Sequence, residues 1–315
     1  MDVLSDLLHR ARARDALVRQ LIQRPPWAIA YADAVPLTVV ATLGGEAWVR
    51  LDGAEPVRLA AGDIALIRGT SPHTIADSPS TLPHFVIRGG RKYLLGTGEE
   101  VVDHGSLAPR TYGDGLPGAT VMLRGLYELR GGVGERLLAM LPPLAVVPAG
   151  PRTGAALDLL GAEIARDEPG QDAVLARLLD LVLVLALRAW CAEPESAPAW
   201  YRALADPAIG DALRLLHQDP ARRWTVAALA AEVGMSRAAF AARFSGLVGE
   251  PPLTYLTGWR MTVGADLLRD TEATVAAVAR EVGYADAFGF SVAFKRARGL
   301  SPSLWRRHSA AAPGR

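Results

Sequence analysis

The sequence is short of cysteine, lysine and asparagine. Its single cysteine, Cys191, cannot form an internal disulfide, so no residue pattern points to an oxidising compartment. We expect this residue to be small, apolar and buried. Only Lys92 and Lys295 are lysines among 34 basic residues, and there is no asparagine. This bias suits a GC-rich genome and indicates no mechanism.

Long apolar runs are also missing. The first twenty residues carry charged side chains where a signal peptide would have an apolar core. The longest fully apolar run in the helical middle, residues 181–187, is far short of the ~20 residues that a membrane span needs. We therefore expect a cytoplasmic protein that makes no membrane contact, and one associated with the nucleoid if it binds DNA.

The charge is divided unevenly along a chain whose net charge is only +1. Residues 205–315 hold 14 basic and 10 acidic side chains, a difference of +4, whereas the rest holds 20 basic and 23 acidic, a difference of −3. Six basic and no acidic residues follow Asp286. A basic carboxyl-terminal end on a near-neutral chain favours a polyanionic partner.

The residue pattern predicts an α+β protein with more than one domain, in keeping with its 315 residues. Residues 2–23 carry leucines at helical spacing and predict an amphipathic helix, which Pro25 and Pro26 end. The following short β-rich runs alternate with glycine-containing turns, as in an antiparallel sandwich or barrel. The predicted strands cover residues 37–43, 47–51, 64–67, 85–87 and 121–129.

Helices are expected in the second half. The predicted helix at 172–192 is leucine-rich on most of its circumference, which leaves two interpretations open: a core helix or a subunit interface. Another helix is predicted at 155–165, and residues 193–198 resemble a linker. The predicted domains are 1–150, a β-rich domain with its amino-terminal helix; 151–204, a helical dimerisation or linker region; and 205–310, an all-helical domain.

Two similar helix pairs are predicted about fifty residues apart. In the first, Thr225 and Ser236 are candidate helix caps on either side of a turn at Gly234. Thr274, Gly283 and Asp286 repeat this arrangement. Each second helix carries two phenylalanines four residues apart, which places them on one face. A helix, a short glycine turn and a helix form the helix-turn-helix unit that reads DNA. A helix at 253–269 lies between the two units.

These residues carry a resemblance to the DNA-binding domain of the AraC/XylS family of transcription regulators. The resemblance covers residues 224–307, about a quarter of the chain. It implies a protein that binds promoter DNA, contacts RNA polymerase if it is an activator, and forms a homodimer. The matching motifs are Leu229-Ala230, Gly234-Met235-Ser236-Arg237, Phe240, Arg243-Phe244, Gly249-Glu250-Pro251-Pro252, Tyr255-Leu256, Trp259-Arg260-Met261, Val278-Ala279, Gly283-Tyr284, Phe290-Ser291, Phe294-Lys295-Arg296, Gly299 and Ser301-Pro302.

The expected DNA-reading faces are unusually apolar for this family. Alanine, valine and phenylalanine side chains contact thymine methyls or sugars and form no hydrogen bonds with bases. Direct readout would then depend on a few polar residues, some of which contact phosphate, and DNA shape would matter more. The predicted DNA-binding residues are Ser236, Arg237, Ala238, Ala241, Ala242 and Arg243 in the first recognition helix and Phe288, Ser291, Val292, Lys295 and Arg296 in the second.

Residues 62–77 resemble the second conserved motif of the cupin barrels, with Gly62 and His73 in place and Asp77 where asparagine is usual. Glu46 fits the end of the first cupin motif. The two histidine positions of that motif fall within residues 39–42, which contain no histidine. One histidine and one glutamate are too few ligands for a stable metal site. We predict no metal, no other cofactor and no catalytic residues.

The full layout, a cupin-like sensor domain at 1–150 followed by paired helix-turn-helix units at 205–310, resembles AraC-type regulators whose barrel binds a small effector. Candidate effector-binding residues are Trp27, Trp48, His73 and His84. Two alternatives stay open: an effector-independent regulator whose barrel is a dimerisation scaffold, and a metal-dependent cupin enzyme.

Overall fold

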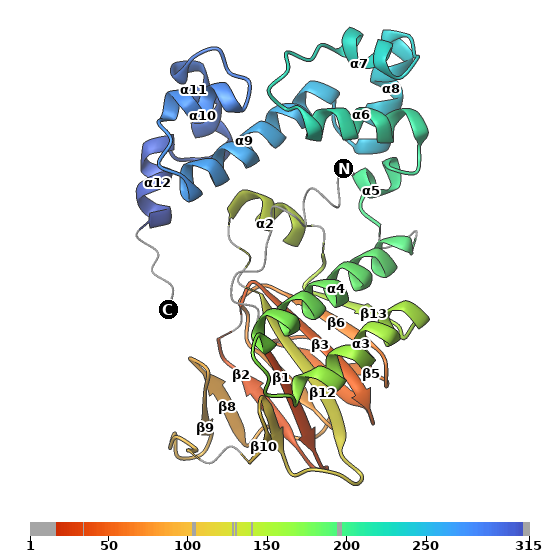
Figure 1. The fold of residues 1–315 in the computed structure, drawn as a ribbon, viewed down its shortest axis with the longest axis vertical. Coiled ribbons are helices and arrows are strands. Elements are labelled where there is room, and N and C mark those ends of the chain that lie inside the picture. Colours follow the sequence, from red (N-terminus) through yellow and green to blue (C-terminus); the bar gives the residue numbers. More distant parts are fainter. Residues whose placement is uncertain are drawn as a thin grey trace. The chain divides into compact units, whose positions relative to one another are not determined.

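The computed structural model describes residues 17–33, 35–102, 105–127, 129, 131–139, 141–193 and 197–310. They form two compact units (Figure 1). The barrel unit comprises the described residues up to 129 together with 138–193. The helical unit comprises 131–137 and 197–310. Within these residues, no helix combines the length and the apolarity needed to cross a membrane.

The barrel unit is a sandwich of two β-sheets (Figure 1). The seven-stranded sheet has the order β10 (Ser106–Ala108), β11 (Thr111–Gly113), β1 (Leu17–Gln23), β12 (Thr120–Tyr127), β3 (Leu37–Gly44), β6 (Ile64–Arg68) and β13 (Leu144–Val147). The six-stranded sheet has the order β5 (Val57–Leu59), β4 (Ala47–Leu51), β7 (His73–Ala76), β2 (Ala28–Tyr31), β8 (Phe85–Arg88) and β9 (Arg91–Leu94).

The core of the sandwich comes from side chains of both sheets that point inward at alternate positions. Val40, Ala65 and Met122 of the larger sheet pack in one cluster with Val49 and Ile75 of the smaller sheet. Strands β3, β4, β6, β8 and β12 lie where the sequence predicted strands, within two residues at each end. The predicted α+β class is confirmed.

The helix predicted for residues 2–23 is wrong over its last seven residues. Leu17–Gln23 is strand β1, and the remainder of that prediction lies outside the described residues. β1 pairs with β12 along its whole length and with β11 on its other side, so its backbone groups are satisfied by neighbours distant in sequence. Leucines at helical spacing are compatible with a strand that is apolar on both faces, and here sheet pairing overrides the helical pattern.

Helices α3 (Pro151–Ile164) and α4 (Gln171–Ala192) cover the outer face of the seven-stranded sheet (Figure 1). Helix α4 lies so close to β12 that position 125 has room only for glycine, because an added Cβ would lie 2.4 Å from Cδ1 of Leu179 on α4. Residues 151–193 therefore group with the barrel unit, whereas 131–137 group with the helical unit. The functional roles assigned to the sequence-defined domains remain predictions.

The helical unit contains two helix-turn-helix pairs joined by a long helix. The elements are α5 (Ala199–Ala203), α6 (Pro207–Gln218), α7 (Val226–Glu232), α8 (Arg237–Val248), α9 (Pro252–Asp270), α10 (Val275–Glu281), α11 (Ala287–Arg298) and α12 (Pro302–Ala310). The four predicted caps are confirmed: each side chain accepts a hydrogen bond from a backbone N–H three residues later. Gly234 and Gly283 adopt φ of 67° and 85°, which glycine tolerates in the two turns.

The helical unit also contains α2 (Gly131–Leu138), apart from its last residue. The Asp266 carboxylate of α9 caps this helix, accepting hydrogen bonds from the backbone N–H groups of Gly132 (2.8 Å) and Val133 (3.2 Å). A carboxylate at this end also matches the positive pole of the helix dipole. The segment between two strands of the barrel unit thus folds as part of the helical unit.

His73, the cupin-motif histidine, is a buried neutral ring in the barrel unit. Its side chain is 3% exposed and stacks on Tyr31 with ring centroids 5.0 Å apart. Neither ring nitrogen has a hydrogen-bond partner of normal geometry among the described residues. Burial, aided by the positive charge of Arg124, lowers the pKa of His73 from 6.5 to about 4.

This depressed pKa predicts an acid-sensitive barrel unit. Below pH 6.5 the unfolded chain takes up a proton that the folded ring resists until about pH 4, so folding stability falls with pH through this window. The loss between pH 7 and pH 5 is about 2 kcal/mol. In His73→Phe, which keeps a ring against Tyr31, this part of the pH dependence should vanish in urea denaturation at the two pH values.

The control is His84→Phe, which introduces the same ring at an exposed position of the barrel unit. An equal loss of stability in His73→Phe and the wild type would mean that His73 already titrates normally in the folded protein.

Candidate nucleic-acid interface and barrel cavity

A pair of buried phenylalanines anchors each of the two predicted recognition helices, α8 and α11. Phe240 and Phe244 of α8 have ring centroids 5.7 Å apart, and Phe290 and Phe294 of α11 have centroids 5.4 Å apart; all four are 0% exposed. Tyr255 of α9 meets Phe244 edge-on at 6.0 Å. Burial of such rings is worth several kcal/mol each, so it sets which face of each helix points outward.

Within the helical unit, the long helix α9 joins the two helix-turn-helix pairs (Figure 1). Its 19 residues give a length of about 28 Å. This length is close to the roughly 34 Å that separates successive major grooves on one side of a DNA duplex. A rigid connector of this length suits two recognition helices that enter neighbouring grooves.

The structure places most of the predicted DNA-binding residues on exposed faces. Ala241 and Ser291 are half-buried, and the hydroxyl of Ser291 donates to the carbonyl of Ala287 at 2.6 Å. The exposed residues are Ser236, Arg237, Ala238, Ala242 and Arg243 on α8 and Phe288, Val292, Lys295 and Arg296 on α11. Their contacts with DNA stay predictions.

The charged residues on these faces differ in whether they form an ion pair with another residue of the protein. Arg243 is held by an ion pair with Asp206, whose carboxylate oxygen lies 2.7 Å from Nε. Arg237, Lys295 and Arg296 form no ion pair within the part of the chain that the structure describes, so their charges are available to a phosphate or a base edge.

The outer face of α11 carries a conspicuous apolar pair. Phe288 is 80% exposed and Val292, four residues later on the same helix face, is 56% exposed. No described residue covers these two side chains, although each would gain by leaving water. Their exposure fits side chains that pack against thymine methyls or sugars.

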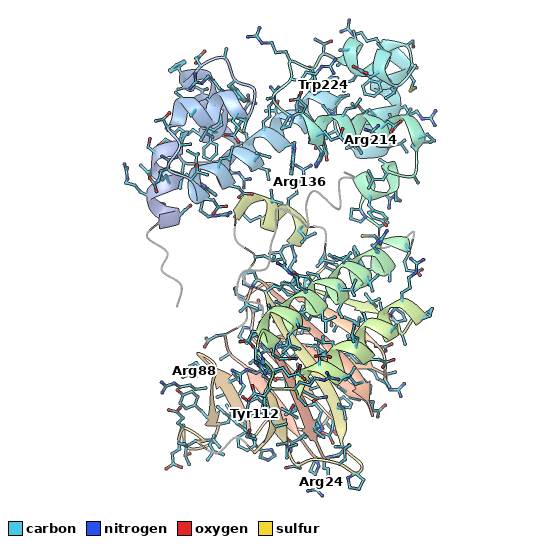
Figure 2. All side chains as sticks on the ribbon, in the orientation of Figure 1. Arg24, Arg88, Tyr112, Arg136, Arg214 and Trp224 are labelled. Carbon is cyan, nitrogen blue, oxygen red and sulfur yellow. The ribbon has the colours of Figure 1, made fainter. Side chains whose placement is uncertain are left out.

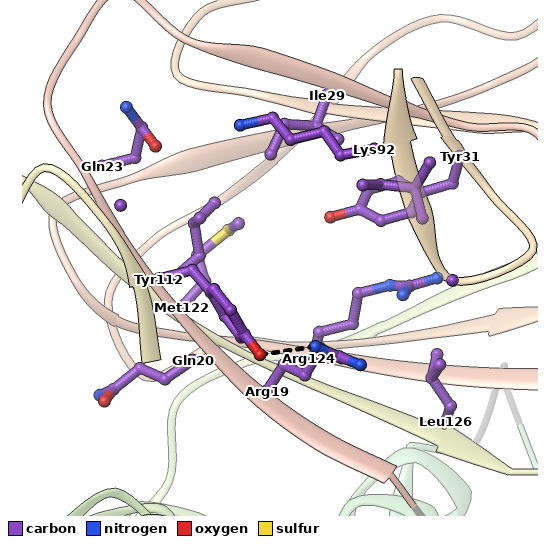
Figure 3. A pocket seen from close by; sticks show the side chains of 14 residues that line it. Arg19, Gln20, Gln23, Ile29, Tyr31, Lys92, Tyr112, Met122, Arg124 and Leu126 are labelled. Carbon is purple, nitrogen blue, oxygen red and sulfur yellow. Dashed lines mark hydrogen bonds between the residues drawn. The ribbon is translucent and has the colours of Figure 1, made fainter. Parts of the chain in front are cut away.

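A separate cavity of about 160 Å³ lies inside the barrel unit, between its sheets (Figure 3). Its polar walls contain three positive charges, Arg19, Lys92 and Arg124, together with Tyr31 and Tyr112. The remaining lining residues are Gln20, Leu21, Gln23, Ile29, Ile87, Gly90, Gly113, Met122 and Leu126. The sequence reasoning missed this set, although an arginine at position 124 within an otherwise apolar strand was a readable signal.

The four predicted effector-binding residues lie elsewhere. Trp27 and His84 line a neighbouring hollow of about 310 Å³, and His73 lines another of about 480 Å³. Trp48, on β4, lines none of these three spaces. Trp27 is also a core residue, which its backbone N–H ties to Asp77 at 3.1 Å. The structure does not bring the four side chains together, and their binding role stays a prediction.

The two residues that match cupin ligand positions are also engaged separately. Glu46 is half-exposed and forms an ion pair with Arg58 at 2.7 Å, whereas His73 is stacked on Tyr31. Among the described residues, no three His, Cys, Asp or Glu side chains gather in a metal-binding group.

Comparison with known proteins identifies both halves of the chain. The Cupin family profile matches residues 2–192, and a helix-turn-helix domain profile matches residues 229–308. A putative AraC-like transcription regulator of Streptomyces antibioticus is 33% identical over 314 residues, covering 98% of this chain and 99% of that one. The HTH-type transcriptional regulator AlkR of Acinetobacter baylyi is 34% identical over 185 residues, 56% of this chain and 60% of that one.

Among solved structures, the DNA-binding domain of the global transcriptional factor AdpA, in complex with a target DNA, is similar to 34% of this chain over 95% of its own length. The identity is 30% and the TM-score 0.32. The two family profiles and the relative matched along its full length point to the same family. The chain therefore belongs to the AraC-type DNA-binding transcription regulators and carries an amino-terminal cupin domain.

Proposed function

We propose that this regulator acts in the cytoplasm as a homodimer on promoter DNA, and that a small molecule in the barrel cavity changes its DNA binding. The observation that carries the proposal is the placement of α2. The chain leaves the barrel sheet after β12, contributes α2 to the helical unit, and returns to the sheet as β13. Both ends of α2 are therefore connected to barrel strands by short segments of chain.

The contacts of α2 centre on α9, the helix that joins the two helix-turn-helix units. Arg136 lies between α2 and α9 (Figure 2), with its guanidinium 4.8 Å from the ring centroid of Tyr255 and 5.7 Å from that of Trp259. Such cation–π contacts contribute about 0.5–2 kcal/mol each. Tyr255 in turn packs against Phe244, an anchor of α8.

The other recognition helix is reached through an ion pair. Glu135 accepts a hydrogen bond at 2.8 Å from Arg298, which lies in the last turn of α11. A second nitrogen of Arg298 donates to the hydroxyl of Thr262 on α9 at 3.3 Å. Docked α2 therefore contacts groups that fix both recognition helices, and its release would change what holds them.

Ligand control follows if α2 is docked to different extents in the free and ligand-bound states. Two measurements on the full chain test this proposal. Thermal shift against a metabolite panel finds ligands that stabilise the native state. Titration of operators, first mapped genome-wide, then shows whether those ligands change the affinity for DNA. Ligands that bind without changing DNA affinity would favour the alternative in which the barrel is a dimerisation scaffold.

Removing the side chains that dock α2 should release it. In the double variant Glu135→Ala/Arg136→Ala, we expect amide exchange of α2 to rise about tenfold, the equivalent of 1.4 kcal/mol, because a cation–π contact and an ion pair are lost. Hydrogen exchange with mass spectrometry measures this. Arg214→Ala, which removes an exposed ion pair with Asp211 on α6, should leave the exchange of α2 unchanged. Unaltered exchange in the double variant would show that other contacts hold α2.

We propose that Arg237, at the start of α8, contacts DNA directly. Its guanidinium is exposed and forms no ion pair among the described residues. Arg237→Ala should weaken operator binding by about 1–3 kcal/mol in an electrophoretic mobility titration. Arg152→Ala, which removes an exposed positive charge from α3 of the barrel unit, is the matched control. If both variants bind as the wild type does, Arg237 is a solvated surface charge.

The proposed dimer contact is a stripe on α4. Val174, Leu178, Leu181 and Leu185 recur at spacings of four, three and four residues, the pattern of a helix-pairing seam. Val174 and Leu181 are each 43% exposed although the opposite face of α4 is buried. This pattern supports both interpretations of the helix, since one face is core and the other is open to a second copy.

A charge in the middle of this stripe should prevent pairing. We expect Leu181→Glu to shift the protein to a monomer in size-exclusion chromatography with light scattering, because an unpaired carboxylate would be buried between subunits. Ala173→Glu places the same charge on an exposed position of α4 outside the stripe and should leave the oligomeric state of the wild type intact. A dimeric Leu181→Glu protein would move the interface elsewhere.

A further inference from the structure

Two arginines face each other inside the barrel cavity. Strands β1 and β12 are antiparallel, and their register places Arg19 directly opposite Arg124. Both side chains line the same cavity (Figure 3). Like charges directly opposite each other on a sheet destabilise it. A third cation, Lys92 of β9, lines the same space, so the fold gathers positive charge where burial makes it costly.

No carboxylate neutralises this cluster within the described part of the chain. The guanidinium of Arg124 lies 3.9 Å from the ring centroid of Tyr31, and its buried Nε has no hydrogen-bond acceptor. Arg19 donates a hydrogen bond to the hydroxyl of Tyr112 at 2.8 Å. Neither arginine forms an ion pair with a described residue.

One carboxylate, that of Asp114, acts on the pKa of Lys92. Asp114 favours the charged form of Lys92, but its carboxylate already accepts hydrogen bonds from the side chain of Gln23 and the backbone of Arg24. Burial lowers the pKa of Arg124, and the charge of Arg19 lowers it further, yet a guanidinium stays protonated at neutral pH. The positive charge is therefore present, and no described carboxylate pairs with either arginine.

The rest of the cavity is apolar. Ile29, Met122 and Leu126 belong to its walls, together with Leu21 and Ile87. Its volume of about 160 Å³ is similar to the roughly 150 Å³ of a cavity that holds one benzene molecule. A ligand with an apolar body about the size of one ring or a short alkyl chain would fill it.

We propose that the cavity binds a small organic carboxylate, whose charge lies between Arg19 and Arg124 and whose apolar body rests on the aliphatic wall. A planar carboxylate accepts two parallel hydrogen bonds from a guanidinium, including one from the unsatisfied Nε of Arg124. It also screens the repulsion between the two arginines. The inference rests on the proposed function, since it names the chemical class of the effector.

Matched pairs of carboxylates and their neutral amides test this assignment on the full chain. We would use benzoate with benzamide, phenylacetate with phenylacetamide, and octanoate with octanamide, measuring thermal shift and calorimetric affinity at millimolar concentrations. At least one carboxylate should bind and raise the melting temperature, whereas its amide should bind on the order of 10- to 100-fold more weakly, because it carries no charge. If no carboxylate binds, or if amides bind equally well, the assignment is wrong.

Variants of Arg124 separate binding from structural support. Arg124→Met should weaken carboxylate binding on the order of 10- to 100-fold while leaving the melting temperature of the ligand-free protein unchanged or raised, because a repulsive buried charge is removed. Arg88→Met, at an exposed position on β8 outside the cavity, should change neither quantity. A clear drop in ligand-free melting temperature, or wild-type affinity in Arg124→Met, would make Arg124 a structural residue and overturn the proposal.

Operator titration in the presence of the same compounds distinguishes a failure of the proposed ligand class from a failure of the proposed ligand control of DNA binding. If a carboxylate binds through Arg124 but leaves the affinity for DNA unaltered, the ligand class is right and ligand control is wrong. If an amide changes DNA affinity and the carboxylates do not bind, ligand control stands and the anion site is wrong.

Discussion

The burial of the aromatic face of α9 is the interaction on which the helical unit depends. Trp259 and Tyr255 are almost fully buried, and His217 of α6 both stacks on Trp259 at 4.1 Å and hydrogen-bonds to the hydroxyl of Tyr255 at 2.7 Å. Phe244 packs against Tyr255 on the same face, and the guanidinium of Arg136 in α2 lies over the ring of Tyr255. One helix therefore fixes both predicted recognition helices and also contacts α2, the segment that lies between two barrel strands in the sequence. A change that loosened α9 would disturb both predicted recognition helices and the docking of α2.

In the barrel unit, by contrast, several of the buried groups lower the stability of the fold. Its cavity keeps Arg19 and Arg124 face to face with no described counter-charge, an arrangement that lowers stability. The neutral buried ring of His73 adds a further cost at acid pH, because burial and Arg124 both disfavour its protonation. A domain selected for stability alone would replace these groups with apolar side chains of similar volume. Their presence beside an open space is most simply explained by a ligand that supplies the missing negative charge.

Local signals were sufficient to predict the helical unit and insufficient for the barrel. Helix caps, turn glycines and the paired phenylalanines act within a few residues, so Thr225, Ser236, Thr274 and Asp286 could be assigned from the sequence. The strand β1 was missed because its partners lie about a hundred residues away, and the register that places Arg19 opposite Arg124 is likewise non-local. The residues predicted to line a pocket were tryptophans and histidines. The polar side chains that line the cavity include arginines, a lysine and tyrosines, which only the pairing of strands brings together.

The chain connects the two proposed sites by a short path. Strand β12 carries Arg124, ends at Tyr127, and is followed four residues later by Gly131, the first residue of α2. A carboxylate bound at the proposed site would contact the strand that leads into α2. The contacts of α2 with Tyr255, Trp259 and Arg298 are individually worth no more than about 2 kcal/mol. Coupling energies in allosteric proteins are typically 1–3 kcal/mol, so a ligand that costs α2 even one of these contacts would shift its docking by a biologically useful amount.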